Sequence, residues 1–167
     1  MFRLSHIVLA VILISGVVLT GCSSTPAVAK NGDTVQVDYT GKLTDGTVFD
    51  SSAGHAPLEF TLGQEQVIPG FEKAILGMKV GEKKTVTIPT AEAYGPYHED
   101  WVMQISRDRI KTDAEITVGQ VLNLTANGQQ FQFLVTNISD NGTLTLDPNS
   151  PLAGKDLTFD IQLIKIK

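Results

Sequence analysis

Alternation of apolar and polar side chains with a period of two is the feature that most limits how this chain can fold. In the first such run, Val35, Val37 and Tyr39 are separated by polar residues, and the same alternation returns in three later segments, at 58–62, 86–88 and 157–163. This period is typical of half-buried β-strands. Between Phe71 and Met78, apolar residues instead recur three and four positions apart, which predicts one short helix. The sequence therefore predicts an α+β fold in which an antiparallel sheet, shaped as a half-barrel, wraps on that helix.

A segment with a different pattern interrupts this series of strands. Two tight-turn signals, Asn127-Gly128 and Asn141-Gly142, separate three short apolar runs. The runs lie at 121–124, 131–135 and 143–146. They predict a three-stranded meander with apolar faces of its own. We therefore expect a small, mainly-β domain inserted at 97–148, between the two parts of a discontinuous main domain at 31–96 and 149–167.

The N-terminal sequence predicts a targeting signal rather than a part of the folded domain. Arg3 precedes an apolar run of about a dozen residues, which ends at Leu19-Thr20-Gly21-Cys22. This ending resembles the lipobox of prokaryotic lipoproteins, in which the cysteine becomes the lipidated first residue of the mature chain. The resemblance implies a signal peptide at 1–21, lipidation of Cys22 and a tether at 22–30. An ordinary signal peptide and an uncleaved anchor helix are the alternatives.

Composition limits both the partners and the location of the protein. The chain has 13 Lys and Arg against 18 Asp and Glu, and removal of residues 1–21 deletes only Arg3, so the net charge changes from −5 to −6. An acidic chain without a basic cluster is a poor match for nucleic acid. Cys22 is the only cysteine, which leaves no partner for an intramolecular disulfide. We expect a monomer that is exported and held by its lipid on the periplasmic or extracellular side of a membrane.

Several motifs in a fixed order resemble the FKBP-type peptidyl-prolyl cis-trans isomerases. They are the opening string 37–52, the segment 63–71 with its Val-Ile-Pro-Gly-Phe run, Ala93-Tyr94-Gly95, and the closing strand 157–160. The segments 93–97 and 149–154, which flank the predicted insertion, are similar to those of the SlyD-like branch of the family. In that branch the extra domain replaces a flap loop and acts as a chaperone. The resemblance implies that this chain isomerises prolyl bonds and that unfolded or proline-containing polypeptides are its partners.

The chemistry of prolyl isomerisation needs neither a nucleophile nor a metal. Twisting the amide breaks its conjugation and makes the carbonyl less polar, so an apolar pocket favours the twisted form. The resemblance assigns catalytic positions to Tyr39, Asp50, Tyr94 and Phe159. It assigns the walls that bind the proline ring to Phe49, Leu58, Val67, Ile68 and Phe71. We expect no cofactor and no metal site.

Two questions stay open at the level of the sequence. Asp50 either takes part in the chemistry or only holds the local structure, since an Asp after a strand is often a turn residue. The protein as a whole could also be a holdase chaperone, or a peptide-binding lipoprotein, with a weak or vestigial isomerase pocket. The complete set of pocket residues favours the isomerase.

Overall fold

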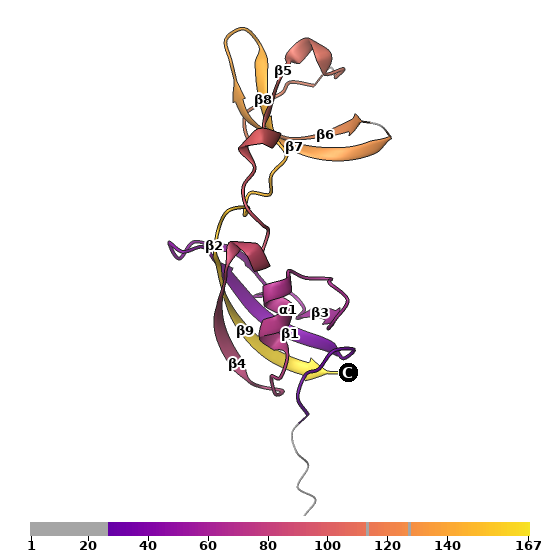
Figure 1. The fold of residues 1–167 in the computed structure, drawn as a ribbon, viewed down its shortest axis with the longest axis vertical. Coiled ribbons are helices and arrows are strands. Elements are labelled where there is room, and N and C mark those ends of the chain that lie inside the picture. The colour runs from indigo at the N-terminus through magenta and orange to yellow at the C-terminus, as the bar shows by residue number, and fades with distance from the viewer. Residues whose placement is uncertain (1–26, 113, 127) are drawn as a thin grey trace, which may run out of the picture.

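The computed structural model describes residues 27–112, 114–126 and 128–167. The predicted signal peptide and the lipidation site Cys22 lie outside these residues. Figure 1 shows two compact parts that follow one another along the long axis and are joined by two connecting segments of the chain. Each part has its own hydrophobic core. We call residues 27–96 and 149–167 the main domain, and residues 97–148 the inserted domain.

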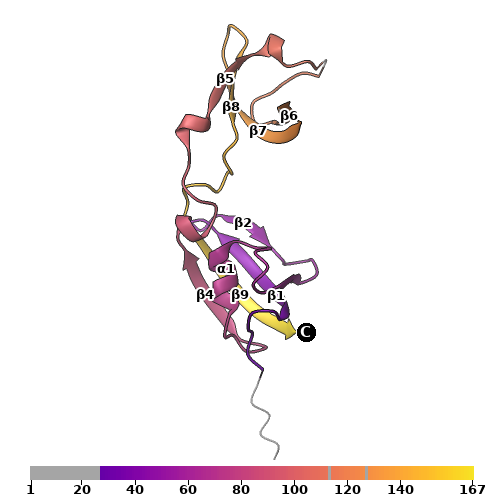
Figure 2. The same cartoon turned by 45° about the vertical axis from the view of Figure 1, so that its right-hand side comes forward.

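The main domain is an antiparallel sheet with a short helix against one face. Its strands are β1 (Thr34–Lys42), β2 (Val48–Ser51), β3 (Leu58–Thr61), β4 (Lys83–Ile88) and β9 (Leu157–Ile166). They lie in the order β2-β1-β9-β4, and β3 also pairs with β1. The helix is α1 (Pro69–Ile75), and Figures 1 and 2 show the sheet curving around it. The predicted α+β fold, with an antiparallel sheet wrapped on a short helix, is confirmed.

Strands β1 and β9 form the centre of this sheet because both alternate apolar and polar residues along their length. Val35 pairs with Ile166 and Val37 pairs with Leu163, so β9 has one extra residue, Ile164, between them. Such a bulge shifts the phase of the alternation by one position. The sequence shows this shift after Leu163, where apolar residues continue at even positions.

The helix packs closely on the sheet because one of its residues has no side chain. A Cβ atom on Gly70 would collide with the side chain of Ile88 on β4. Pro69 begins the helix, a position where its missing N–H leaves no intrahelical bond unmade. From this helix, Phe71 and Ile75 enter a core that also contains the fully buried Leu62 of the segment after β3.

The segment before β1 differs from its prediction. Ala29 is 3% exposed, its N–H donates to the carbonyl of Met78 at 2.9 Å, and its carbonyl accepts the N–H of Gly77 at 2.8 Å. Val28 forms a β-bridge with Lys79. The prediction of a tether at 22–30 is therefore wrong at its C-terminal end, because residues 28–30 belong to the main domain. Local sequence gave no sign of this, since the contact is made with a turn about fifty positions away.

The inserted domain is a second antiparallel sheet. Its strands are β5 (Met103–Ser106), β6 (Val121–Ala126), β7 (Gln129–Ile138) and β8 (Thr143–Asp147), in the order β5-β8-β7-β6. The last three are the predicted meander. Strand β5 is an addition to the prediction, because its four residues are too few to stand out as an alternating run. Short 3-10 turns lie at Thr90–Glu92, Glu99–Trp101 and Arg107–Arg109.

Hydrogen bonds link the two connecting segments that join the domains. The hydroxyl of Tyr97 donates to Oδ2 of Asp147 at 2.8 Å. Asn149 is bonded twice to the backbone of His98, through Oδ1 at 3.0 Å and Nδ2 at 2.9 Å. Burial opposes the ionisation of Asp147, but hydrogen bonds from Asn149 and Tyr97 outweigh it and lower the pKa of this carboxyl. We call these four residues the neck clamp. None of the helices in the described residues is long and apolar enough to span a membrane.

Candidate active site

One small hollow of the main domain brings together residues from four strands, the helix and the loops beside them. Its volume is about 190 Å³. It is lined by Tyr39, Phe49, Asp50, Leu58, Gln66, Val67, Ile68, Phe71, Tyr94 and Phe159. All nine residues that the sequence singled out for the site are in this set. Gln66 is the one addition, and its side-chain oxygen accepts the N–H of Thr61 at 2.8 Å.

Aromatic rings packed edge to face form the floor of the hollow. Phe159 of β9 is at the centre, with its ring centroid 5.1 Å from Phe71 and 5.6 Å from Phe49. The ring of Tyr39 lies 5.7 Å from that of Phe71, again at a steep angle. Phe71 and Phe159 are buried, at 3% and 5% exposed. Edge-to-face packing favours fixed ring positions, so the floor presents a rigid apolar surface.

The rings can lie this close to the sheet because Gly41 lies near the end of β1. Gly41 pairs with Phe159, and a Cβ atom there would lie 2.6 Å from the ring of Phe49 and 2.9 Å from that of Phe159. Glycine is unfavourable inside a strand unless something approaches the backbone closely. Sequence reasoning missed this role for Gly41, although a glycine within an alternating run is the signal that could have revealed it.

A hydrogen-bonded pair forms the polar side of the hollow. The hydroxyl of Tyr39 donates to Oδ2 of Asp50 at 2.7 Å, and Oδ1 of Asp50 accepts the N–H of Ser51 at 2.8 Å. Burial raises the pKa of Tyr39 to about 12, and the bond to Asp50 and its charge add to this shift. Tyr39 therefore stays protonated around neutral pH and remains a donor to the carboxylate.

Ser52 is a second residue that the sequence analysis missed. It holds the Tyr39–Asp50 pair in place by hydrogen bonds. Its hydroxyl oxygen accepts the N–H of Tyr39 at 3.0 Å and donates to Asp38 at 3.2 Å. Its own N–H donates to the carbonyl of Tyr39 at 3.0 Å. Because Ser52 is buried, with only 8% of its surface exposed, these bonds are shielded from water and hold the end of β2 against β1.

Tyr94 lies at the edge of the hollow, on the segment that leads towards the inserted domain. It is 48% exposed, in contrast to the buried rings of the floor. A hydroxyl in this position can reach a substrate backbone without being desolvated in the free protein. Only two residues separate it from Tyr97 of the neck clamp.

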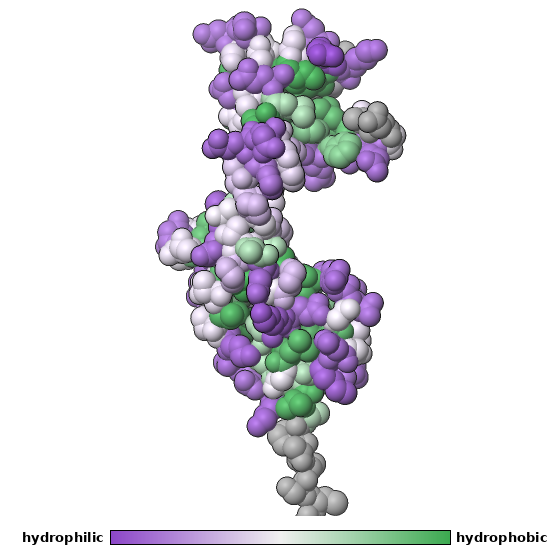
Figure 3. Space-filling model, in the orientation of Figure 1, coloured by the Kyte–Doolittle hydropathy of each residue, from purple (hydrophilic) through white to green (hydrophobic). Residues whose placement is uncertain are grey.

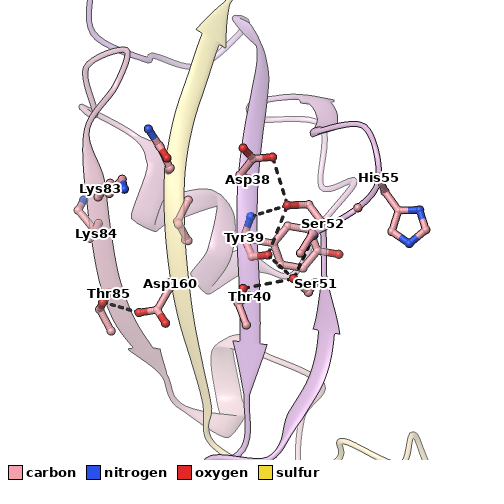
Figure 4. A pocket seen from close by; sticks show the side chains of 14 residues that line it. Asp38, Tyr39, Thr40, Ser51, Ser52, His55, Lys83, Lys84, Thr85 and Asp160 are labelled. Atoms are coloured by element: carbon pink, nitrogen blue, oxygen red, sulfur yellow. Dashed lines mark hydrogen bonds between the residues drawn. The ribbon is translucent and has the colours of Figure 1, made fainter.

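A polar hollow, of about 580 Å³, lies on the opposite face of the sheet (Figure 4). Its side chains are mainly polar and bond to one another. Asp160 accepts Lys42 at 2.7 Å and Thr85 at 2.6 Å, and these bonds, Lys42 first, lower the pKa of its carboxyl. A proline ring needs apolar walls, so the smaller aromatic hollow is the better candidate site. No cluster of three metal-ligating side chains occurs among the residues that the structure describes.

Comparison with known proteins places this geometry in a family. Residues 25–164 match the family described as FKBP-type peptidyl-prolyl cis-trans isomerase. The chain is 34% identical over 133 residues to the FKBP-type peptidyl-prolyl cis-trans isomerase SlyD of Treponema pallidum, covering 80% of this chain and 75% of the relative. It is 35% identical over 148 residues to the short-type peptidyl-prolyl cis-trans isomerase of Methanocaldococcus jannaschii, covering 80% and 91%.

A third relative matches a shorter stretch at higher identity. FK506-binding protein 2 of Yarrowia lipolytica is 60% identical over 68 residues, which is 40% of this chain and 47% of the relative. The matches at lower identity extend over about four fifths of the chain. The chain belongs to the FKBP-type peptidyl-prolyl cis-trans isomerases, enzymes whose substrates are proline-containing polypeptides.

Proposed function

We propose that this isomerase acts on exported, unfolded polypeptides, which the inserted domain holds while their prolyl bonds enter the aromatic hollow. The observation that carries the proposal is the presence of two separate apolar hollows, one in each domain. The first is small and rigid and suits a single ring. The second is large and open and suits a length of chain. The protein would therefore combine an enzyme and a chaperone.

In the aromatic hollow, the rings of Phe71 and Phe159 would surround the proline ring of the substrate. Rotation about a peptide bond must overcome a barrier of roughly 18–20 kcal/mol, which arises from its partial double-bond character. Apolar walls exclude water that would stabilise the polar, planar amide, and so favour the less polar twisted form. The hydroxyl of Tyr94 would donate a hydrogen bond to a substrate carbonyl.

Asp50 would act by orientation and charge rather than by proton transfer. Both of its oxygens already accept hydrogen bonds, from Tyr39 and from the N–H of Ser51. A carboxylate held in this way keeps a fixed direction at the rim of the hollow. Its negative charge would then interact with the changing dipole of the amide as the bond twists.

The hollow of the inserted domain has features that suit it to hold an unfolded chain. Its volume is about 640 Å³. Among the residues that line it, Met103 and Phe131 are each 43% exposed, and Ile110 and Leu124 are half-buried. Figure 3 shows apolar surface on the inserted domain. An exposed apolar patch of this kind commonly marks a binding surface.

The neck clamp would couple holding to catalysis. It joins the two chain segments that cross between the domains, and it begins three residues after Tyr94. A client bound in the larger hollow would therefore present its prolines close to the smaller one. For a short connection, the local concentration gained in this way is about millimolar.

Export and anchoring are the third part of the proposal. They rest on the Leu19-Thr20-Gly21-Cys22 string and on the apolar run before it. Stable anchoring by lipid needs two signals, such as a second acyl chain, because one chain gives only marginal binding. The native protein should then partition with membranes, and Cys22→Ser should release it or leave its signal unprocessed. An unmodified Cys22 in the membrane-bound form, seen by mass spectrometry, would contradict the anchor.

A refolding assay separates the proposed enzyme-chaperone from a pure holdase. A protein whose refolding is limited by a prolyl bond is refolded with this protein at about one hundredth of its concentration. An isomerase turns over, so we expect the slow phase to accelerate in proportion to the catalyst. A holdase with a vestigial pocket would act only at equimolar amounts, and that result would overturn the proposal.

A further inference from the structure

The described chain begins at the end of the main domain that lies away from the inserted domain (Figures 1 and 2). The start of β1 meets the end of β9 there, since the N–H of Lys167 donates to the carbonyl of Thr34 at 2.8 Å. The turn before β4 lies against the second half of β9, where the N–H of Gly81 donates to the carbonyl of Leu163 at 2.7 Å. Val28, bridged to Lys79, fixes the beginning of the described chain to the same end.

Cys22 precedes this end by very few residues. Only six positions separate it from Val28. Even a fully extended chain of that length spans about 20 Å. A lipid on Cys22 would therefore keep this end of the main domain close to the bilayer, whatever conformation the intervening residues adopt.

We propose that this end of the main domain is a docking surface for an anionic lipid bilayer. We call it the basal surface and define it by its exposed apolar and basic residues, Val28, Lys30, Lys79, Val80, Lys83, Lys165 and Lys167. The inference rests on the proposed lipid anchor, and it adds that the protein's own residues set how the anchored molecule is oriented.

Exposed apolar side chains at the centre of the basal surface support this. Val28 is 45% exposed and Val80 is 53% exposed, and the bridge between Val28 and Lys79 makes them neighbours. Figure 3 shows apolar surface beside the point where the described chain begins, with hydrophilic residues around it. This combination of a small apolar centre and long cationic side chains matches the boundary between headgroups and acyl chains.

The charge of the basal surface is opposite to that of the whole protein. Five lysines gather there, while the nearby carboxylates are Asp33, Glu59 and Glu82. Two of the lysines are paired, Lys30 with Asp33 at 2.7 Å and Lys167 with Glu59 at 2.7 Å. The other three form no ion pair within the described part of the chain. A basic end on a mature chain of net charge −6 faces an anionic surface favourably, and the rest of the molecule is repelled by that surface.

Docking in this way would fix the direction of the whole molecule. The acyl chains would supply the affinity, and the basal surface would set the orientation. The inserted domain and the neck would then point away from the bilayer, towards polypeptides in the aqueous compartment. This orientation gives clients access to both apolar hollows without competition from the lipid surface.

Lysine labelling of the lipidated mature protein, residues 22–167, tests the basal surface. The protein is reconstituted into phosphatidylglycerol-containing vesicles, separated by flotation, and labelled briefly with an amine-reactive reagent. We expect Lys79, Lys83 and Lys165 to be protected about threefold or more relative to the same protein in detergent. Lys111 and Lys155, which lie away from the basal surface, serve as internal controls and should be labelled equally in both. About 0.5 M salt should reduce the protection.

A charge-reversal pair separates the basal surface from the anchor. The double variant K79E/K83E should still float with the vesicles, keep normal tetrapeptide isomerisation and lose the protection at Lys165. The matched variant K111E/K155E should keep the protection at Lys165. Protein that does not float would overturn the anchor and this inference together. Protein that floats with equal labelling of Lys79, Lys83, Lys165, Lys111 and Lys155 would overturn the basal surface alone. Equal protection of Lys79, Lys83 and Lys165 on uncharged vesicles would overturn its preference for an anionic bilayer.

Discussion

The two apolar hollows of this molecule differ in how their walls are held. In the main domain, Phe71 and Phe159 are almost fully buried and pack edge to face around about 190 Å³. In the inserted domain, Met103 and Phe131 are nearly half exposed around about 640 Å³. Rigid rings select one shape, whereas exposed side chains can adjust to many. Under the proposed function, selectivity for the prolyl bond and tolerance of varied client sequences would therefore reside in different domains.

The loop beside the larger hollow shows how the inserted domain keeps an open site without a large core. Arg107 donates to the carbonyls of Ile110, Thr112 and Ala114, at 2.9, 3.0 and 3.1 Å. One guanidinium therefore replaces the backbone pairing that a regular strand would supply. The aromatic hollow instead takes its order from a continuous sheet.

Removing the inserted domain should produce the largest difference between substrates. Replacing residues 97–148 with a short Gly-rich loop should leave tetrapeptide isomerisation within a few-fold of normal. Catalysis of protein refolding should fall about 100-fold, because the client is no longer held near the pocket. The ratio of the two catalytic efficiencies measures the effect. Equal losses on both substrates would mean that the inserted domain only supports the pocket.

Substitutions in the aromatic hollow should affect both substrates alike. Tyr94→Ala and Phe159→Ala should each lower the catalytic efficiency at least tenfold, about 1.4 kcal/mol of transition-state stabilisation. Tyr94→Ala is the cleaner variant because its exposed side chain contributes little to the core, whereas Phe159→Ala removes about 3–5 kcal/mol of folding free energy. Thermal unfolding must show that each variant is folded. Full activity of both folded variants would refute the site.

Substitution of one exposed ring in the hollow of the inserted domain should affect the protein substrate more than the tetrapeptide. Phe131→Ser should reduce refolding catalysis about threefold to tenfold by removing one apolar contact with the client. Its effect on tetrapeptide isomerisation should be negligible. Val118→Ser is the matched control, because Val118 is also exposed, at 59%, but does not line the hollow. The same loss in both variants would show that general surface hydrophobicity, and not this hollow, binds the client.

The smallest expected effect concerns the hydroxyl of Tyr39. Because folding raises its pKa from 10.0 to about 12, its contribution to stability is complete below pH 10 and is lost as the pH rises towards 12. Tyr39→Phe should therefore lower the free energy of unfolding by about 1 kcal/mol at pH 8 and by less near pH 11.5. Urea denaturation of both proteins at the two pH values measures this. A difference that does not change with pH would mean that folding does not raise the pKa of Tyr39.

Much of the site could be predicted because its residues come from several local motifs. The motifs around Tyr39, Asp50, Phe71, Tyr94 and Phe159 are each legible in the chain, and the fold brings all of them to one hollow. Their catalytic roles stay predictions until they are measured. The supporting residues Gly41 and Ser52 were missed because their importance lies in what approaches them. Nothing in the adjacent sequence specifies that two aromatic rings lie against Gly41.

The sequence by itself determined the strands of the main sheet and the helix, because burial of one face imposes a period that can be read locally. It also indicated the meander β6 to β8, because tight-turn signals separate these strands. Only the tertiary structure decided that β5 completes the second sheet, that Ala29 belongs to the core, and that the neck clamp joins residues about fifty positions apart. These features depend on which distant surfaces meet, and the free energy of such contacts leaves no regular pattern in either segment alone.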